Sequence, residues 1–197
     1  MKLINSILPI LIFISVLVFS GCSATPKPSG AIAQSVQKTS LSENSRPGYT
    51  QALNKLKNKN YSDASNDLQK IMTENPGFIE GWSNLALAQL KAGNISQAKQ
   101  ALDNAIKLEQ NSALIENLAG LIDVENGSYK SAEQHYATAI RLNPNLANSQ
   151  YNLALLYDVY YQNVPKAIQH YERYLALTNS VDAETTSWVE ELKRKLQ

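Results

Sequence analysis

Small and large apolar residues recur along this chain at a nearly constant interval. Alanines stand 34, 34 and 35 residues apart, at Ala64, Ala98, Ala132 and Ala167. Large residues follow four positions later, at Leu68, Leu102, Tyr136 and Tyr171, and further apolar residues follow seven positions later, at Ile71, Ala105, Ala139 and Tyr174. Spacings of four and seven place these side chains on one face of a helix. The fixed interval therefore predicts a stacked array of helical repeats.

The pattern predicts four helix–turn–helix repeats and no other kind of domain between residues 48 and 181. Small residues at the recurring positions let two helices approach to about 8–10 Å, and the larger residues fill the groove between them. A single helix pair cannot bury its apolar face, so about three or more repeats are needed for stability. The predicted repeats span residues 48–78, 79–112, 113–146 and 147–181.

A final helix is predicted over residues 182–197, where it would cap the last repeat. Trp188, Leu192 and Leu196 are spaced by four residues and form one narrow apolar stripe. Asp182 comes at the start of this segment, where a negative charge complements the helix dipole.

Two stretches resemble the tetratricopeptide repeat family, whose period is 34 residues. The residues that carry the resemblance are Gly127, Tyr129, Ala132, Tyr136, Ala139, Leu142 and Pro144, and Trp82, Leu85, Ala86, Gly93, Ala98, Leu102, Ala105 and Leu108. The first copy departs from the pattern at Lys55, where an apolar residue is usual, and the fourth carries one extra residue around Val164–Pro165. The resemblance implies an all-α, right-handed superhelical solenoid that binds other proteins on its concave surface.

The N-terminus has the pattern of a secretory signal. Lys2 precedes a thirteen-residue apolar run, residues 7–19, which is short for a membrane span of about 20 residues. The following Ser20, Gly21 and Cys22 resemble the signal of bacterial lipoproteins. The resemblance implies a signal peptide over residues 1–21 and lipidation of Cys22, with an outer-membrane location because Ser23 follows. The alternative is an uncleaved anchor with an incidental cysteine.

A polar segment separates this signal from the repeats. Residues 22–47 are rich in Ser, Thr, Gln, Pro and Gly and cannot bury enough apolar surface to offset their ordering entropy. We expect a flexible tether with a reach of about 25–30 Å. It would hold the repeats close to the membrane, in the periplasm of a cell with two membranes.

Composition and motifs give no indication of catalysis. The formal net charge is +1, so the chain has no basic surplus for nucleic acid. The sequence contains none of the common phosphate-binding, zinc-protease or serine-hydrolase motifs, and no cofactor or small-molecule substrate is inferred. His135 and His170 occupy equivalent places in adjacent repeats, about 8–10 Å apart, which is too far for both to bind one metal ion. A non-enzymatic protein is expected.

An Asn-Leu-Ala triplet marks the candidate partner-binding groove, because it begins at Asn84, Asn117 and Asn152. Amides on the inner wall could donate to and accept from a peptide backbone. The alternative, weighed equally, is that they bond a neighbouring repeat. One turn further along lie Leu87, Gly120 and Leu155, with Lys91, Asp123 and Asp158 nearby. Tyr160 and Tyr161 adjoin the extra residue and are further candidates for partner contact.

The combination of lipid signal and repeats resembles bacterial tetratricopeptide lipoproteins of the type IV pilus assembly, or pilotin, kind. This implies a membrane-anchored protein that binds and positions other envelope proteins during pilus or secretin assembly. The alternatives are an accessory of another envelope machine, for energy-coupled transport or polysaccharide export, and a scaffold for a cell-wall enzyme.

Overall fold

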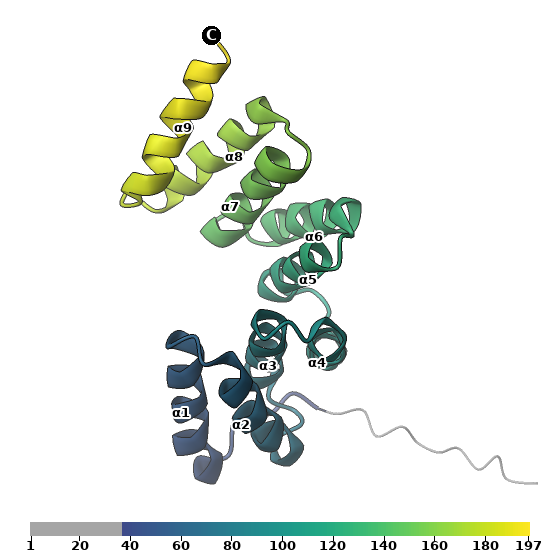
Figure 1. The fold of residues 1–197 in the computed structure, drawn as a ribbon. Helices are drawn as coiled ribbons and strands as arrows, with labels where there is room; N and C mark the ends of the chain where they lie inside the picture. The colour runs from purple at the N-terminus through teal and green to yellow at the C-terminus, as the bar shows by residue number, and fades with distance from the viewer. Residues whose placement is uncertain (1–36) are drawn as a thin grey trace, which may run out of the picture. The chain divides into compact units, whose positions relative to one another are not determined.

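The computed structural model describes residues 37–197, and this part of the chain consists of helices joined by short turns, without β-strands (Figure 1). The predicted all-α class is therefore confirmed. The elements are η1 (Glu43–Ser45), α1 (Arg46–Lys57), α2 (Tyr61–Glu74), α3 (Ile79–Lys91), α4 (Ile95–Leu108), α5 (Ala113–Glu125), α6 (Tyr129–Leu142), α7 (Ala147–Leu155), η2 (Leu156–Tyr160), α8 (Val164–Leu177) and α9 (Ala183–Lys195). None of these helices has both the length and the apolar character required to cross a bilayer.

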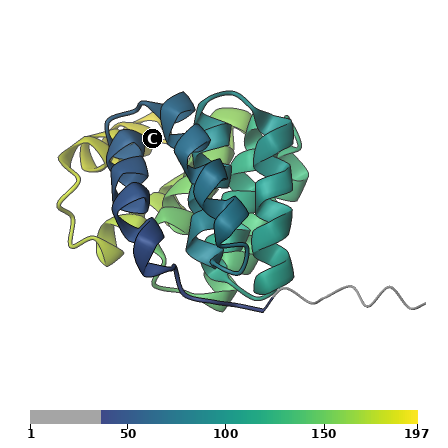
Figure 2. The ribbon, with the colours of Figure 1, turned by 90° about the horizontal axis from the view of Figure 1, so that it is seen from below.

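The helices pack as four successive pairs, and each pair also packs against the next (Figures 1 and 2). The first helices of the second, third and fourth pairs begin at Ile79, Ala113 and Ala147, at intervals of 34 residues. Their buried residues form two clusters, one in the first two pairs and one in the last two pairs with α9, and Leu121 packs against both. The packed helix–turn–helix repeats agree with the prediction.

The recurring alanines lie where the helices of a pair meet. Ala64, Ala98, Ala132 and Ala167 are all 0% exposed. The large residues four positions later are buried as well. A methyl group at each contact lets the helix backbones approach closely, while the larger side chains fill the groove beside it. The 34-residue pattern thus reports the core of the solenoid.

The turn between the two helices of a pair requires a left-handed backbone at one position. Gly93 and Gly127 take this position with φ of 82° and 75°. In the first and fourth pairs the same position holds Lys59 and Gln162, with φ of 61° and 51°. A residue with a Cβ atom loses about 1–2 kcal/mol in this conformation, so these two turns are less favourable than the glycine turns.

The extra residue of the fourth repeat lies in its first helix, not around Val164–Pro165 as the sequence suggested. The second and third pairs place 16 residues between the starts of their two helices, and the fourth places 17, from Ala147 to Val164. The helix widens into a π-helical segment over Leu156–Tyr160, which takes up one additional residue without breaking the helix. Leu156 and Tyr157 of this segment are buried.

The packed part of the chain begins before the predicted end of the tether at residue 47. The amide of Thr39 donates a hydrogen bond of 2.8 Å to the carbonyl of Gly77, and the side chain of Leu41 is buried. Because Leu41 supplies apolar area and the backbone finds a partner in the turn after α2, the boundary moves toward the N-terminus by about ten residues. Residues 1–36, with the predicted signal peptide, Cys22 and the remaining tether, lie outside the described residues.

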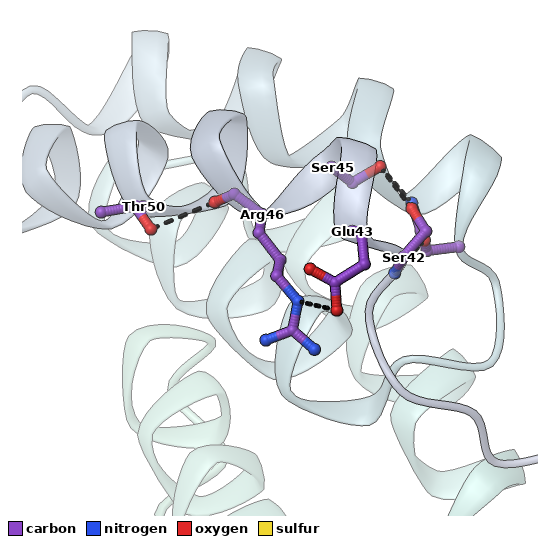
Figure 3. A network of polar contacts seen from close by, with 6 residues as sticks. Ser42, Glu43, Ser45, Arg46 and Thr50 are labelled. Carbon is purple, nitrogen blue, oxygen red and sulfur yellow. Dashed lines mark hydrogen bonds and ion pairs between the residues drawn. The ribbon is translucent and has the colours of Figure 1, made fainter.

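A network of polar side chains fixes the start of α1 (Figure 3). The hydroxyl of Ser42 donates to that of Ser45 at 2.9 Å, and the buried amide of Asn75 also donates to Ser45 at 2.9 Å. The Nε atom of Arg46 lies 3.1 Å from an oxygen of Glu43. These contacts join the short helix η1 to the end of α2.

The last helix, α9, packs against α8 through a different face from the one that the sequence suggested. Its buried residues are Thr185, Val189 and Leu192, whereas Trp188 and Leu196 are exposed. The apolar stripe was therefore wrong in two of its three members. The cause is a rotation of the helix that turns the small Thr185 toward α8 and leaves the indole at the surface.

Candidate partner-binding surface

The asparagines of the predicted groove bond to neighbouring repeats. The Nδ2 atom of Asn84 donates to the hydroxyl of Tyr49 at 2.6 Å. The Oδ1 atom of Asn117 accepts from Nδ2 of Asn152 and from the hydroxyl of Ser149, both at 3.0 Å. Each bond joins the first helices of successive pairs. This arrangement is the alternative in which the amides stabilise the stacking; a contact with a partner stays a prediction.

The three Asn-Leu-Ala triplets do not occupy equivalent positions. Counted from the helix starts at 79, 113 and 147, Asn84 and Asn152 share the sixth position, but Asn117 is the fifth residue of its helix. The sixth residue of α5 is Leu118, which is buried. The triplet interval of 33 and then 35 residues, against the repeat interval of 34, contained this difference.

The other predicted groove residues separate into different environments. Lys91 is exposed at the end of α3, and Leu87 packs at the edge of the N-terminal core. Asp123 faces the second helix of its own pair, with Oδ2 at 3.6 Å from Nε2 of His135. Gly120 is covered by the ring of Tyr136. These residues do not combine into a single surface.

Leu155 and Asp158 are the two predicted residues that the structure brings together. They line a cavity of about 520 Å³ between the α7–η2 helix and α9. The cavity combines aromatic and aliphatic side chains with carboxylates. Its lining residues are Tyr151, Leu155, Asp158, Val159, Tyr171, Asp182, Glu184, Thr185, Ser187, Trp188 and Glu191. We refer to these residues as the C-terminal groove.

Hydrogen bonds to Asp158 hold the aromatic side chains of the C-terminal groove in place. Its Oδ2 atom accepts from Nε1 of Trp188 at 2.7 Å and from the hydroxyl of Tyr171 at 3.4 Å. Burial, followed by the charge of Asp158, raises the pKa of Tyr171 above its ordinary value. The phenol therefore stays protonated and continues to donate at neutral pH.

The carboxylate of Asp182 has a structural task at the start of α9. It accepts from the amide of Thr185 at 2.9 Å, from the hydroxyl of Thr185 at 2.7 Å and from the hydroxyl of Tyr174 at 3.0 Å. The bonds from Thr185 lower the pKa of Asp182 below its ordinary value. The residue caps the helix as the sequence predicted and remains charged near neutral pH.

The rim of the C-terminal groove exposes apolar surface. Val159 is 56% exposed and Trp188 is 40% exposed. The Nζ atom of Lys195 lies 5.2 Å from the centre of an aromatic ring of Trp188 and 2.8 Å from Oε1 of Glu191. An exposed indole beside carboxylates is a typical anchor for a binding partner.

Tyr160 and Tyr161, the further candidates from the sequence, lie outside the C-terminal groove. They are 42% and 38% exposed, respectively. The ring of Tyr160 packs against that of Tyr129 with centroids 4.3 Å apart, and the ring of Tyr161 lies 5.8 Å from that of Tyr157. Both tyrosines are therefore partly occupied by packing within the repeats.

A second hollow lies at the opposite end of the repeat array in sequence. It has a volume of about 650 Å³ and is formed by residues 38–41, α1 and the start of α3. Tyr49 and Phe78 form its apolar part, with ring centroids 5.1 Å apart, and Arg46 and Glu80 bring charges of both signs. This hollow therefore has no predominant charge.

The two histidines make equivalent contacts in adjacent repeats. The Nδ1 atom of His135 lies 2.7 Å from Oε2 of Glu116, and Nδ1 of His170 lies 2.8 Å from Oε1 of Gln150. Each contact joins the second helix of a pair to the fourth residue of the first helix. Within residues 37–197 no cluster of three or more His, Cys, Asp or Glu side chains has the arrangement of a metal site.

Sequence reasoning missed the contribution of α9 to the C-terminal groove. Trp188, Glu184 and Glu191 come from the helix that was interpreted as a cap alone. Tyr151 was assigned to the core. The longer final interval, 35 residues, was the one signal that the fourth repeat differs from the others, but it does not indicate the rotation of α9.

The helix pairs define the class of the molecule as a helical repeat scaffold. Family models described as tetratricopeptide repeat and TPR repeat match residues 55–122 and 120–163, which together cover more than half of the chain. The chain belongs to the tetratricopeptide repeat family. Members of this family are generally non-catalytic scaffolds that present extended surfaces to other proteins.

Solved structures of other repeat proteins share this fold. The thermophilic TPR protein TTC0263 of Thermus thermophilus matches with a TM-score of 0.66 at 19% identity, over 74% of this chain and 79% of that chain. PilF of Pseudomonas aeruginosa matches with a TM-score of 0.66 at 20% identity, over 76% and 68%. YrrB, described as a TPR protein with an unusual peptide-binding site, matches with a TM-score of 0.57 at 17% identity, over 73% of each chain. The comparison with curated proteins found no match.

Proposed function

We propose that this protein is a lipid-anchored adaptor that binds a segment of another envelope protein and positions it at the membrane. The observation that carries this proposal is the C-terminal groove. There, Trp188 and Val159 leave apolar surface exposed beside a cavity of about 520 Å³. Apolar side chains elsewhere in the repeats are mostly packed between helices. Exposed aromatic surface around a cavity favours binding of a partner.

The anchor rests on the sequence. Cys22 after a short apolar run would carry the lipid, and at least two acyl chains are needed because one chain binds a membrane only marginally. The polar residues that follow would give the repeats freedom to reach a partner near the outer membrane, facing the periplasm. The inner membrane and the extracellular face are the alternative locations.

Among envelope systems, we favour type IV pilus or secretin assembly. The likeness of the fold to PilF supports this choice, together with the pairing of a lipoprotein signal and repeats. Accessory roles in energy-coupled transport, in polysaccharide export or beside a cell-wall enzyme remain the alternatives. The identity of the captured partner decides between them.

The binding test is affinity capture from an extract of the cell envelope with the full chain as bait. Trp188→Ala removes the exposed indole, and Leu114→Ala is the matched control, because Leu114 is 65% exposed and lies outside the C-terminal groove. Trp188→Ala should lose partners that Leu114→Ala retains, while both variants keep the melting temperature of the parent. Equal capture by the two variants would exclude the groove as the binding surface.

The anchoring test is separate and does not depend on the partner. Cys22→Ala should accumulate as unprocessed precursor or leave the membrane fraction. Intact-mass measurement of the parent protein from membranes should show acyl chains on Cys22. An unmodified thiol at this position would refute the lipid anchor and leave the binding proposal intact.

A further inference from the structure

We propose that the C-terminal groove binds an extended segment in which a lysine or arginine stands next to aliphatic residues. This inference rests on the proposed function, because it specifies the chemistry of the partner at the same surface. It depends on three features of the groove: the sign of its charges, the cation that already contacts its indole, and the fixed orientation of its aromatic rings.

The groove carries charges of one sign. Four of its eleven lining residues are acidic, namely Asp158, Asp182, Glu184 and Glu191, and none of the eleven, all of which the structure describes, is basic. Asp182 is committed to the helix cap, so the other three carboxylates are those available to a ligand. A concave surface with one sign of charge attracts ligands of the opposite sign.

A lysine of the chain itself illustrates the recognition. The ammonium group of Lys195 lies 5.2 Å from the centre of a ring of Trp188 and 2.8 Å from Oε1 of Glu191. A cation over an indole face gains electrostatic energy from the ring quadrupole, and the carboxylate adds an ion pair. A lysine or arginine of the partner could replace Lys195, which is itself exposed at the end of α9.

The aromatic walls are oriented before a ligand arrives. Asp158 accepts from both Trp188 and Tyr171, so the rings from α9 and α8 are joined to η2. The ring of Tyr151 packs against Tyr171 with centroids 5.7 Å apart. Because fewer side chains must be ordered during binding, less conformational entropy is lost. Leu155 and the exposed Val159 then supply contacts for an aliphatic neighbour of the cation.

The test is selection of decapeptides from a phage-displayed random library on the immobilised full chain. Peptides enriched on the parent protein, but not on Trp188→Ala, should contain a lysine or arginine next to an aliphatic residue. A synthetic copy of the most enriched peptide then serves as the probe in calorimetric titrations. Its affinity should fall as salt rises, because exposed charges are screened.

Three variants measure the contributions of the groove to the affinity of that peptide. Trp188→Ala should weaken binding by about two- to thirtyfold, the range expected for loss of a cation–π contact. Glu184→Gln with Glu191→Gln should weaken it by a similar factor. Lys195→Ala should strengthen binding by up to about fivefold, because the competing cation is removed.

The matched control removes the same net charge elsewhere. Asp103→Asn with Glu125→Gln neutralises two exposed carboxylates outside the groove and should leave the affinity within about twofold of the parent. Equal weakening by both pairs would reduce the effect to net charge and overturn the inference.

The remaining outcomes also decide the question. Enrichment of acidic or uncharged peptides that depend on Trp188 would overturn the cationic ligand but support the proposed function. Absence of any enriched peptide would overturn this inference, while affinity capture would still decide the proposed function. Dissociation of a dimer by groove substitutions, seen by light scattering, would overturn the peptide ligand and assign the groove to a second copy of the chain.

Discussion

Gly120 allows a direct test of how tightly the third helix pair is packed. A Cβ atom at this position would lie 2.4 Å from Cε1 and 2.6 Å from Cδ1 of Tyr136. Tyr136 is 1% exposed, so its ring is enclosed on all sides. We therefore predict that Gly120→Ala destabilises the protein, although alanine normally stabilises the interior of a helix.

The two opposing contributions can be compared in magnitude. Replacement of glycine by alanine inside a helix gains about 1 kcal/mol from propensity. Overpacking in a well-filled core costs about 1–3 kcal/mol, and contacts this short with an enclosed ring favour the upper part of that range. The net loss of unfolding free energy should be about 1–2 kcal/mol, or roughly 2–8 °C in melting temperature for a chain of this size.

Gly48→Ala is the matched control, because its Cβ atom would meet only Cδ1 of Ile71 at an ordinary 3.7 Å. It should raise the unfolding free energy by about 0.5–1 kcal/mol. The assay is thermal and urea unfolding followed by circular dichroism at 222 nm. A double variant, Gly120→Ala with Tyr136→Leu, should recover part of the loss, because it reproduces the combination of Ala86 and Leu102 in the preceding repeat. Stabilisation by Gly120→Ala alone would refute the proposed packing of α5 on α6.

Three further predictions follow from single contacts. Asn117→Ala should lower the unfolding free energy by about 1–2 kcal/mol in urea titrations, because the buried hydroxyl of Ser149 loses its acceptor; an unchanged midpoint would mean that this bond adds nothing to repeat stacking. Gln162→Gly should raise the melting temperature in calorimetry, since it relieves a φ of 51°, and a lower melting temperature would contradict the turn strain. Burial, followed by the charge of Lys166, lowers the pKa of His170 from 6.5, so the unfolded state binds this proton more readily. Stability should therefore fall as pH decreases below about 6.5, and melting curves from pH 7 to 5 should show a smaller decrease for His170→Gln; identical pH profiles would exclude this histidine as the cause.

The fold could be predicted from the sequence because its packing is local and repeated. Each recurring alanine, such as Ala98, contacts the other helix of its own pair, so a 34-residue interval reports the same contact several times. The turn glycines Gly93 and Gly127 report a left-handed backbone in the same way. Such features need no knowledge of distant residues.

The candidate site could be predicted only in part, because it depends on how non-repeating segments turn. Leu155 and Asp158 were assigned to a binding surface from repeat position alone, and the structure places both in one cavity. The apolar stripe of the last helix included Trp188 correctly as an apolar residue, but one rotation of α9 decides whether it is buried or exposed. The extra residue in η2 likewise changes the direction of side chains without any local sequence signal.

The central claim is that a partner protein binds in the C-terminal groove. Its most direct measurement is site-specific photocrosslinking in living cells, with a benzophenone amino acid in place of Val159 at the groove or Ala137 on α6, both of which are exposed. The Val159 position should yield a discrete adduct with an envelope protein, and Trp188→Ala should abolish it, while the Ala137 position yields none. Adducts from the Ala137 position alone, or a Val159 adduct that persists in the Trp188→Ala background, would contradict the account.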